Sequence, residues 1–391
     1  MPGSVSIDDL KSHLALALVP NLGPGRTASV IAKFGSAAAA LKATYQQLVT
    51  IPGLGEKLAS QFAEKFRTVN VDAEWELIQS FGISNLILGR PDYPERLAQI
   101  PNAPPLLYLR GEISPVDVNA VGIVGSRVCT SYGRKITEKI ASGLARAGWT
   151  VVSGLARGID GEAHRAALNA GGRTIAVLAG GLSRIYPPEH KDLAEQIVSR
   201  GCLVTETPMT VEPQPGMFPA RNRIISGLSR AVVIVEANLK SGALITATHA
   251  AEQGREVFAV PGPADSPASA GCLDLIRKGV RLVRNADDIL EDLKGIAPIE
   301  PPKAAASLFD SVGESGPRSR SESVSVPISM AIPSGLDDSQ MKVWSALDRL
   351  MSLDELTRLT AIPVGTLSMH LMQLELKKAV KRLPGNQFER R

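Results

Sequence analysis

The sequence has 391 residues, of which 44% are hydrophobic, and its formal net charge is only +4. This length exceeds that of one ordinary domain, so we expect two or three domains, and any nucleic-acid surface has to be a local basic patch. Three widely spaced cysteines and the lack of an HExxH motif exclude a disulfide framework and the common zinc sites, so we expect a cytoplasmic protein without a bound metal.

No apolar stretch is long enough to cross a bilayer, so no membrane contact is expected. The apolar run from Leu14 to Val19 resembles the core of a signal peptide. However, it follows Asp8 and Asp9, where a signal peptide carries positive charge.

Residues 1–80 are predicted to be helical and contain one internal repeat. The segment from Val19 to Gly25 recurs thirty residues later, from Ile51, and both copies hold a glycine–x–glycine turn. Such a turn between two short helices is typical of a helix-hairpin-helix (SAM-like) domain, whose backbone amides bind phosphates without reading sequence. A plain helical bundle with glycine C-caps is the alternative.

Residues 81–293 form the predicted central domain. It begins with a proline-rich connector over 88–111, which carries a short strand at 106–109. Strands and helices then alternate, as in a doubly wound α/β sheet that binds ligands at the carboxyl ends of its strands. The expected strands are 120–124, 149–152, 174–178, 202–205, 231–235, 256–260 and 280–283, and the expected helices are 132–147, 160–170, 190–199, 221–229, 241–253 and 270–278.

Glycine-containing turns end the first two of these strands. Gly125-Ser126-Arg127 follows the first strand, and Ser153-Gly154 follows the second. Glycine permits close approach of a phosphate, and the next helix offers unpaired N–H groups, so we expect an anion site at each turn. The alternative is an N-cap serine with a solvated arginine. His164, in the helix that follows Gly154, is expected to be structural.

Two later segments add candidates for the same edge of the sheet. Phe218, Arg221, Asn222 and Arg223 open a predicted helix, where arginines suit phosphates and the aromatic ring suits a stacked base. Pairing of these arginines with acids across the sheet is the alternative, and Glu236 is one such acid. We expect Tyr186 to pack under its loop rather than to stack on a base.

Lys240, Ser241 and Gly242 form the last anion turn, at the start of another helix. The sequence has no GxGxxG after its first strand, no GxxxxGK[ST] and no GxSxG motif. No pair of carboxylates in matching loops indicates hydrolysis. We therefore predict no catalytic residue and no cofactor, and a polyphosphate ligand, such as a single DNA strand, that is held rather than transformed.

The C-terminal part divides into a linker and a small domain. Residues 294–335 are rich in Pro, Ser and Ala and are predicted to be disordered. Residues 336–391 have the helix–helix–helix–wing order of a winged-helix domain. The expected recognition helix, from residue 364 to 370, carries no Arg or Lys, so protein contact is as plausible a role as DNA contact.

Several strings of the central domain resemble the DNA-processing protein A (DprA or Smf) family. They run in order over about 170 residues, and the flanking helix-hairpin-helix and winged-helix segments agree with the family layout. The strings are Tyr93-Pro94, Val124-Gly-Ser-Arg127, Tyr132-Gly133, Ser153-Gly-Leu-Ala-Arg-Gly-Ile-Asp160, Tyr186-Pro187, Phe218-Pro-Ala-Arg-Asn-Arg223, Ser241-Gly-Ala-Leu-Ile-Thr-Ala247, Gly254-Arg255 and Val260-Pro-Gly262.

This resemblance implies an extended Rossmann domain that binds single-stranded DNA and forms homodimers. It implies a role in natural transformation, in which the protein protects incoming strands, displaces single-strand-binding protein and loads a RecA-type recombinase. By position, Gly125, Ser126, Arg127, Phe218, Arg221 and Arg223 belong to the strand-binding pocket, with Ser241 and Gly242 nearby. The alternative is a Rossmann-type enzyme acting on a nucleotide, similar to phosphoribohydrolases.

Overall fold

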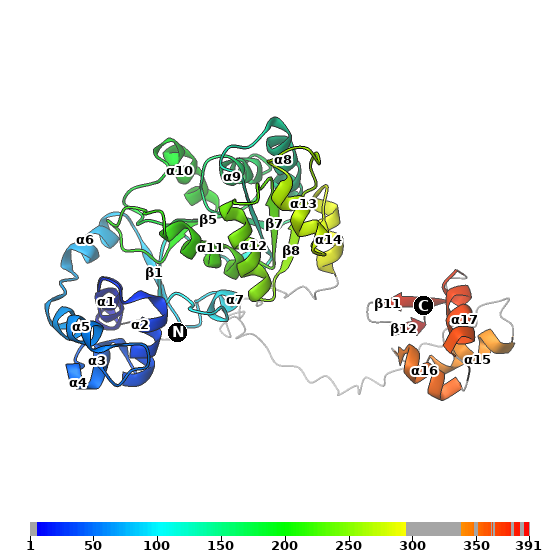
Figure 1. The fold of residues 1–391 in the computed structure, drawn as a ribbon, viewed down its shortest axis with the longest axis horizontal. Helices are drawn as coiled ribbons and strands as arrows, with labels where there is room; N and C mark the ends of the chain where they lie inside the picture. Colours follow the sequence, from blue (N-terminus) through cyan, green and yellow to red (C-terminus); the bar gives the residue numbers. More distant parts are fainter. Residues whose placement is uncertain are drawn as a thin grey trace, which may run out of the picture. The chain divides into compact units, whose positions relative to one another are not determined.

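The computed structural model describes residues 6–294, 338–347, 351–360, 362, 364–376, 379–383 and 387–390. The chain divides into two compact units, Met1–Ala304 and Ala305–Arg391 (Figure 1). The predicted linker over 294–335 lies, apart from its first residue, outside the described residues.

A nine-stranded sheet organises the first unit, in the order β1-β2-β6-β5-β4-β3-β7-β8-β9. Neighbours from β6 to β9 pair in parallel, and β1 and β2 are antiparallel additions at one edge. The central strands are short apolar runs that are buried on both faces, as parallel strands require. The predicted doubly wound, mainly parallel sheet is therefore confirmed. The strands are β1 Ser84–Ile87, β2 Leu106–Gly111, β3 Ala120–Gly125, β4 Thr150–Ser153, β5 Thr174–Val177, β6 Cys202–Thr205, β7 Ala231–Val235, β8 Glu256–Ala259 and β9 Arg281–Leu282.

Helices cover both faces of this sheet (Figure 1). Alternate residues of β7 point to opposite sides, so Val232 packs in one core cluster and Val233 in the other. One face carries α8 Ser131–Arg146, α9 Ile159–Asn169, α10 Lys191–Arg200 and α14 Ala286–Lys294, and the other carries α7 Glu95–Ala98, α11 Met217–Leu228, α12 Gly242–Glu252 and α13 Ala270–Arg277.

The chain reverses its direction of winding between β3 and β7. After β3 it enters α8 on one face, and after β7 it enters α12 on the other. Such a switch point opens a crevice at the carboxyl ends of the two strands. Most of the candidate residues predicted from the sequence lie around this crevice.

Helices α1 to α6 precede the sheet. The two repeated segments lie at the α1–α2 and α4–α5 connections, with Gly23 and Gly25 in the first turn of α2, and the helix-hairpin-helix assignment stays a prediction. Leu14 of α1 and Ile78 of α6 join the core that covers Tyr108 of β2, and the buried carboxylate of Glu74 accepts a hydrogen bond from the Met209 amide at 2.8 Å. The expected division near residue 80 stays a prediction, since one compact unit spans both segments. The helices are α1 Ile7–Ala17, α2 Gly23–Phe34, α3 Ala37–Ala40, α4 Tyr45–Leu48, α5 Glu56–Thr68 and α6 Asp72–Ser80.

The described residues of the second unit form three helices followed by a hairpin, in the order that the sequence predicted. Its core includes Trp344, Leu356, Leu367 and Leu371. Across the described parts of the chain, no helix is both long and apolar enough to span a bilayer. The elements are α15 Asp338–Ala346, β10 Met351–Ser352, α16 Leu353–Thr360, α17 Val364–Leu376, β11 Val380–Leu383 and β12 Gln387–Arg390.

Candidate nucleic-acid interface

The crevice at the switch point holds a pocket of about 440 Å³. It is bounded by the end of β3, the start of α11 and the turn before α12, so three segments that are distant in the sequence meet there. Most of the predicted residues line it, namely Gly125, Ser126, Arg127, Phe218, Arg221, Asn222, Ser241 and Gly242.

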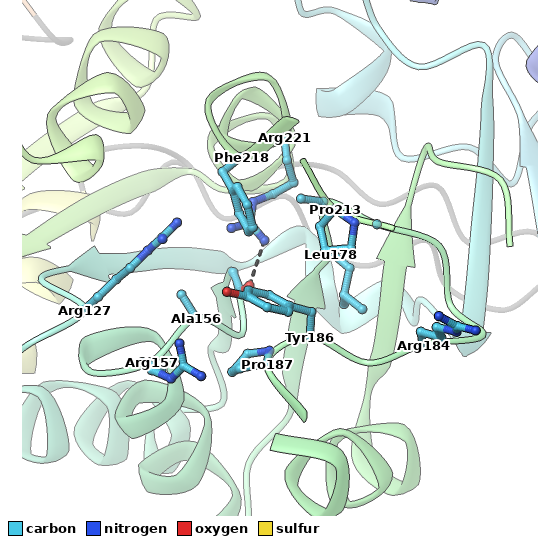
Figure 2. Close-up of a pocket in the computed structure, with 13 residues that line it drawn as sticks. Arg127, Ala156, Arg157, Leu178, Arg184, Tyr186, Pro187, Pro213, Phe218 and Arg221 are labelled. Atoms are coloured by element: carbon cyan, nitrogen blue, oxygen red, sulfur yellow. Dashed lines mark hydrogen bonds between the residues drawn. The ribbon is translucent and has the colours of Figure 1, made fainter. Parts of the chain in front are cut away.

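A smaller, more enclosed pocket adjoins it, lined by Gly154, Arg127, Phe218, Arg221 and Tyr186 among others (Figure 2). The guanidinium carbon of Arg127 lies 4.8 Å from the centroid of the Phe218 ring. The centroids of the Tyr186 and Phe218 rings are 5.8 Å apart, and the two ring planes are inclined at 55°. Tyr186 is 41% exposed. Our expectation that Tyr186 packs under its loop is therefore wrong, because its ring forms an open aromatic corner with Phe218.

Arg127 carries the available positive charge of this corner. It is exposed and, among the described residues, it makes neither an ion pair nor a hydrogen bond. By contrast, Arg157 pairs with Glu189, and Arg184 pairs with Glu212. A cation held over an aromatic ring keeps its charge free for a phosphate.

Arg221 is buried, at 5% exposure. Its Nη1 donates to the carbonyl oxygens of Gly154, at 2.7 Å, and Val177. Burial lowers the pKa of Arg221 to about 10, the charge of Asp160 opposes this shift, and Arg127 adds to it. Arg221 is thus charged at neutral pH but is held mainly by the protein, which makes it an anchor of the pocket wall.

Asp160 is the counter-charge of Arg221, and the prediction of site residues omitted it. Its carboxylate accepts from the amides of Gly154, at 3.2 Å, and Ala156, at 3.4 Å. Burial raises the pKa of Asp160, and the charge of Arg221 opposes this shift. Aspartate is common in the first turn of a helix, where it interacts favourably with the helix dipole, so no local pattern distinguishes Asp160 as a site residue.

The glycines of the two strand-end turns face protein atoms rather than an open space. A methyl group at Gly154 would lie 2.6 Å from the Asp160 carboxylate and would overlap Arg221. At Gly242, by contrast, a methyl group would meet nothing within 4 Å. The turn that is open to a phosphate is therefore the one at the start of α12.

Ser241 caps α12, because its side chain accepts from the amide of Ala243 at 3.3 Å. Lys240 is exposed beside this turn but does not line the pocket. Ser126 uses its hydroxyl within its own loop, donating to the carbonyl of Val128 at 2.8 Å.

Arg223 is not in the pocket, which corrects the sequence prediction. Its Nη2 lies 2.5 Å from the Glu206 carboxylate, and both side chains are largely buried. Successive residues of a helix are rotated by about 100°, so residues two apart face away from each other. Arg221 and Arg223 therefore cannot share one site. The alternative of pairing with an acid holds for Arg223.

Glu236 pairs with neither arginine, so that expectation is wrong. Its carboxylate accepts from the Thr130 amide at 2.9 Å and from the Thr130 hydroxyl, at the start of α8.

A further pocket of about 410 Å³, lined by Arg127, Arg134 and Arg165 among others, extends the basic surface past the β3–α8 loop. No group of three or more metal-ligating side chains occurs in the described ranges.

His164 is fully buried, and it lines neither pocket at the switch point. The hydroxyl of Thr174 donates to the Val151 carbonyl, so His164 Nδ1 donates to that hydroxyl at 2.6 Å. Nε2 is then a buried acceptor that has no partner in the part of the chain that the structure describes. Burial is the main cause that lowers the pKa of His164 to about 3. The structural role expected from the sequence agrees with this geometry.

We expect His164 to make the protein acid-sensitive. Its folded pKa lies below the unfolded value of 6.5, so the stability is complete above pH 6.5 and is lost as pH falls toward 3. Between pH 7.5 and 4.5 the loss from this group is about 2.5 kcal/mol. Urea unfolding at the two pH values measures this loss of unfolding free energy, and the His164→Gln protein should lose markedly less stability over the same range. Equal losses in the two proteins would contradict the assignment.

Residues 84–294 match the family model of DNA recombination-mediator protein A, and residues 329–386 match that of the DprA winged helix domain. Protein Smf of Synechocystis sp. is 36% identical over 395 residues, which cover 97% of this chain and 98% of that protein. DNA processing protein DprA of Bacillus subtilis is 44% identical over 213 residues, 54% of this chain and 72% of that protein.

Two solved structures have the same fold over much of the chain. The X-ray structure of DprA from Streptococcus pneumoniae has a TM-score of 0.63 and 33% identity, and the match covers 72% of this chain and 97% of that one. DNA processing protein A from Helicobacter pylori, whose single-stranded DNA binding mode has been described, has a TM-score of 0.50 and 30% identity, covering 55% and 96%. The resemblance and the winged-helix prediction are confirmed, and the chain belongs to the DNA recombination-mediator protein A (DprA/Smf) family.

Proposed function

We propose that the pocket at the switch point binds single-stranded DNA without sequence preference. The observation that carries this proposal is Arg127, which pairs with no carboxylate of the described residues and stacks on Phe218 at the mouth of the pocket. The relative from Helicobacter pylori, which is described as a single-stranded DNA binder, supports it.

The pocket offers both kinds of contact that a single strand needs. A phosphate fits between Arg127 and the N-terminus of α12 at Gly242, where the helix dipole and a cation favour negative charge. A base fits against the open corner of Phe218 and Tyr186, because stacking on an aromatic ring accepts any base. Arg134 and Arg165 line the neighbouring pocket, into which a bound strand would continue.

We further propose that the protein acts as a recombination mediator in natural transformation. In this role it protects the strand, displaces single-strand-binding protein and loads a RecA-type recombinase. Membership of the recombination-mediator family supports this role. Homodimer formation, cytoplasmic location and the two protein partners stay predictions.

The nucleotide-processing alternative finds little support at the pocket. Asp160 and Glu236, its nearest buried carboxylates, both accept hydrogen bonds from protein groups. A general base needs a carboxylate that can reach a bound water or substrate proton. We infer that these two groups anchor loops.

We expect Arg127→Ala to weaken binding of labelled oligo-dT by about 1–3 kcal/mol and to lower the salt dependence of binding. The effect should be the same for other strand sequences, because a phosphate contact carries no sequence information. Fluorescence anisotropy at several salt concentrations measures both quantities. Arg146→Ala is the matched control, since Arg146 is the last residue of α8 and lies at the opposite end of the sheet from the pocket.

Equal affinity of Arg127→Ala and the unchanged protein would refute the pocket assignment. Indifference of the unchanged protein to oligo-dT would refute the function itself. In that case turnover of nucleoside monophosphates would test the enzyme alternative.

A further inference from the structure

Three arginines lie at the end of the sheet opposite the DNA pocket, where the parallel strands begin. Arg230 directly precedes β7, Arg255 directly precedes β8, and Arg96 lies in α7. Arg255 Nη2 donates to the Arg96 carbonyl oxygen at 2.9 Å, and the guanidinium carbon of Arg230 lies 5.9 Å from the centroid of the Trp149 ring. The Tyr93-Pro94 and Gly254-Arg255 strings of the sequence lie here and have no part in the DNA pocket.

Two of these arginines, which are half-buried, each leave one buried donor atom without a hydrogen bond among the described residues. These donors are the Nε atoms of Arg96 and Arg255. Neither side chain forms an ion pair with a described residue, whereas Arg110, Arg173 and Arg223 of the same unit each pair with a carboxylate. Buried polar groups are rarely left without partners, so this surface has the character of an incomplete anion site.

Electrostatics point the same way. Burial lowers the pKa of Arg96, Arg230 and Arg255, and the charge of Arg96 lowers it further for the other two. Glu95 opposes the shift of Arg96. A carboxylate placed among the three arginines would relieve their mutual repulsion.

Arg96 also lines a pocket of about 440 Å³, which gives the site a second chemical character. Much of its lining is apolar, including Pro94, Ile113, Val118 and Leu228. Charged donors beside an apolar hollow suit a ligand that carries both carboxylates and an apolar side chain.

We propose that this surface, the Arg96 pocket, binds an acidic peptide segment of a partner protein, with carboxylates on Arg96 and Arg255 and an apolar side chain in the hollow. Nucleic acid fits less well, because the hollow is largely apolar and no exposed aromatic ring lines it for a base to stack on. Tyr93 offers no stacking face, since its ring is buried and its hydroxyl donates to the Pro104 carbonyl at 2.8 Å.

The full-length chain is titrated against a fluorescein-labelled peptide, Asp-Asp-Leu-Asp-Leu-Phe, and a version with asparagine at each aspartate. We expect the acidic peptide to bind, and the neutral version and the Arg96→Gln protein each to weaken binding roughly tenfold or more. Arg255→Gln should act likewise if its thermal unfolding is unchanged, and Arg146→Gln should have no effect. Arg127→Ala should retain peptide binding, which separates this site from the DNA pocket.

Three outcomes overturn the proposal. The first is absence of peptide binding by the unchanged protein, and the second is equal affinity for the acidic and neutral peptides. The third is a loss of oligo-dT affinity in Arg96→Gln with no change in peptide affinity, which would make the cluster a nucleic-acid contact.

Discussion

We expect Arg221→Ala to lower the free energy of unfolding by about 3–5 kcal/mol, more than any other substitution of a polar side chain in the pocket. The reason is the position of its guanidinium, which is buried, bonded to the carbonyls of Gly154 and Val177, and close to Asp160. Removing it leaves a buried carboxylate without its counter-charge. Urea denaturation measures the change.

Two comparisons identify the cause. Arg146→Ala, an exposed arginine, should change stability by less than about 0.5 kcal/mol. If the orphaned carboxylate of Asp160 causes the loss, then Asp160→Asn combined with Arg221→Ala should cost clearly less than the sum of the single variants. An Arg221→Ala protein of unchanged stability that only loses DNA affinity would mean that Arg221 acts as a ligand contact, as the sequence predicted.

The second large effect is expected for Gly125→Ala. The added methyl group would overlap the carbonyl oxygen of Val235 on the neighbouring strand β7 and would lie 2.7 Å from Cγ1 of Ile159. The backbone of a central strand cannot move aside without breaking the pairing of β3 with β7. We expect a loss of about 3 kcal/mol or more in the free energy of unfolding.

Gly242→Ala is the matched control, because it makes the same chemical change at another glycine of the pocket. Its methyl group meets nothing within 4 Å, so stability should change by less than about 0.5 kcal/mol. Thermal or urea unfolding of the two variants side by side decides the matter. Similar stability of both variants would mean that the end of β3 accommodates a methyl group at residue 125.

The sheet was predictable because its strands are continuous apolar runs with glycine turns between strands and helices. Strand β1 was missed, since it has four residues and begins with the polar Ser84 and Asn85 at the edge of the sheet. Helix α11 begins at Met217 rather than Arg221, because Pro219 fits the first turn of a helix.

The site was only partly predictable, and the errors have a physical pattern. Residue types indicated an anion pocket, and Arg127 and Phe218 meet as expected. The prediction grouped Arg221 with Arg223 by residue type, although helical periodicity places Phe218, Arg221 and Asn222 on one face and excludes Arg223. The burial of Arg221 and its electrostatic interaction with Asp160 depend on contacts between distant segments, which no local pattern contains.

The core shared by the N-terminal helices and the sheet has a consequence for how such proteins evolve. Leu14 and Ile78 cover side chains of β2 and β6, such as Tyr108 and Leu203, and Glu74 holds the loop at Met209. A lineage that exchanged these helices for another module would have to replace the covered side chains of the sheet as well. A gene fusion that cuts between the helices and the sheet would therefore leave an apolar surface open to aggregation.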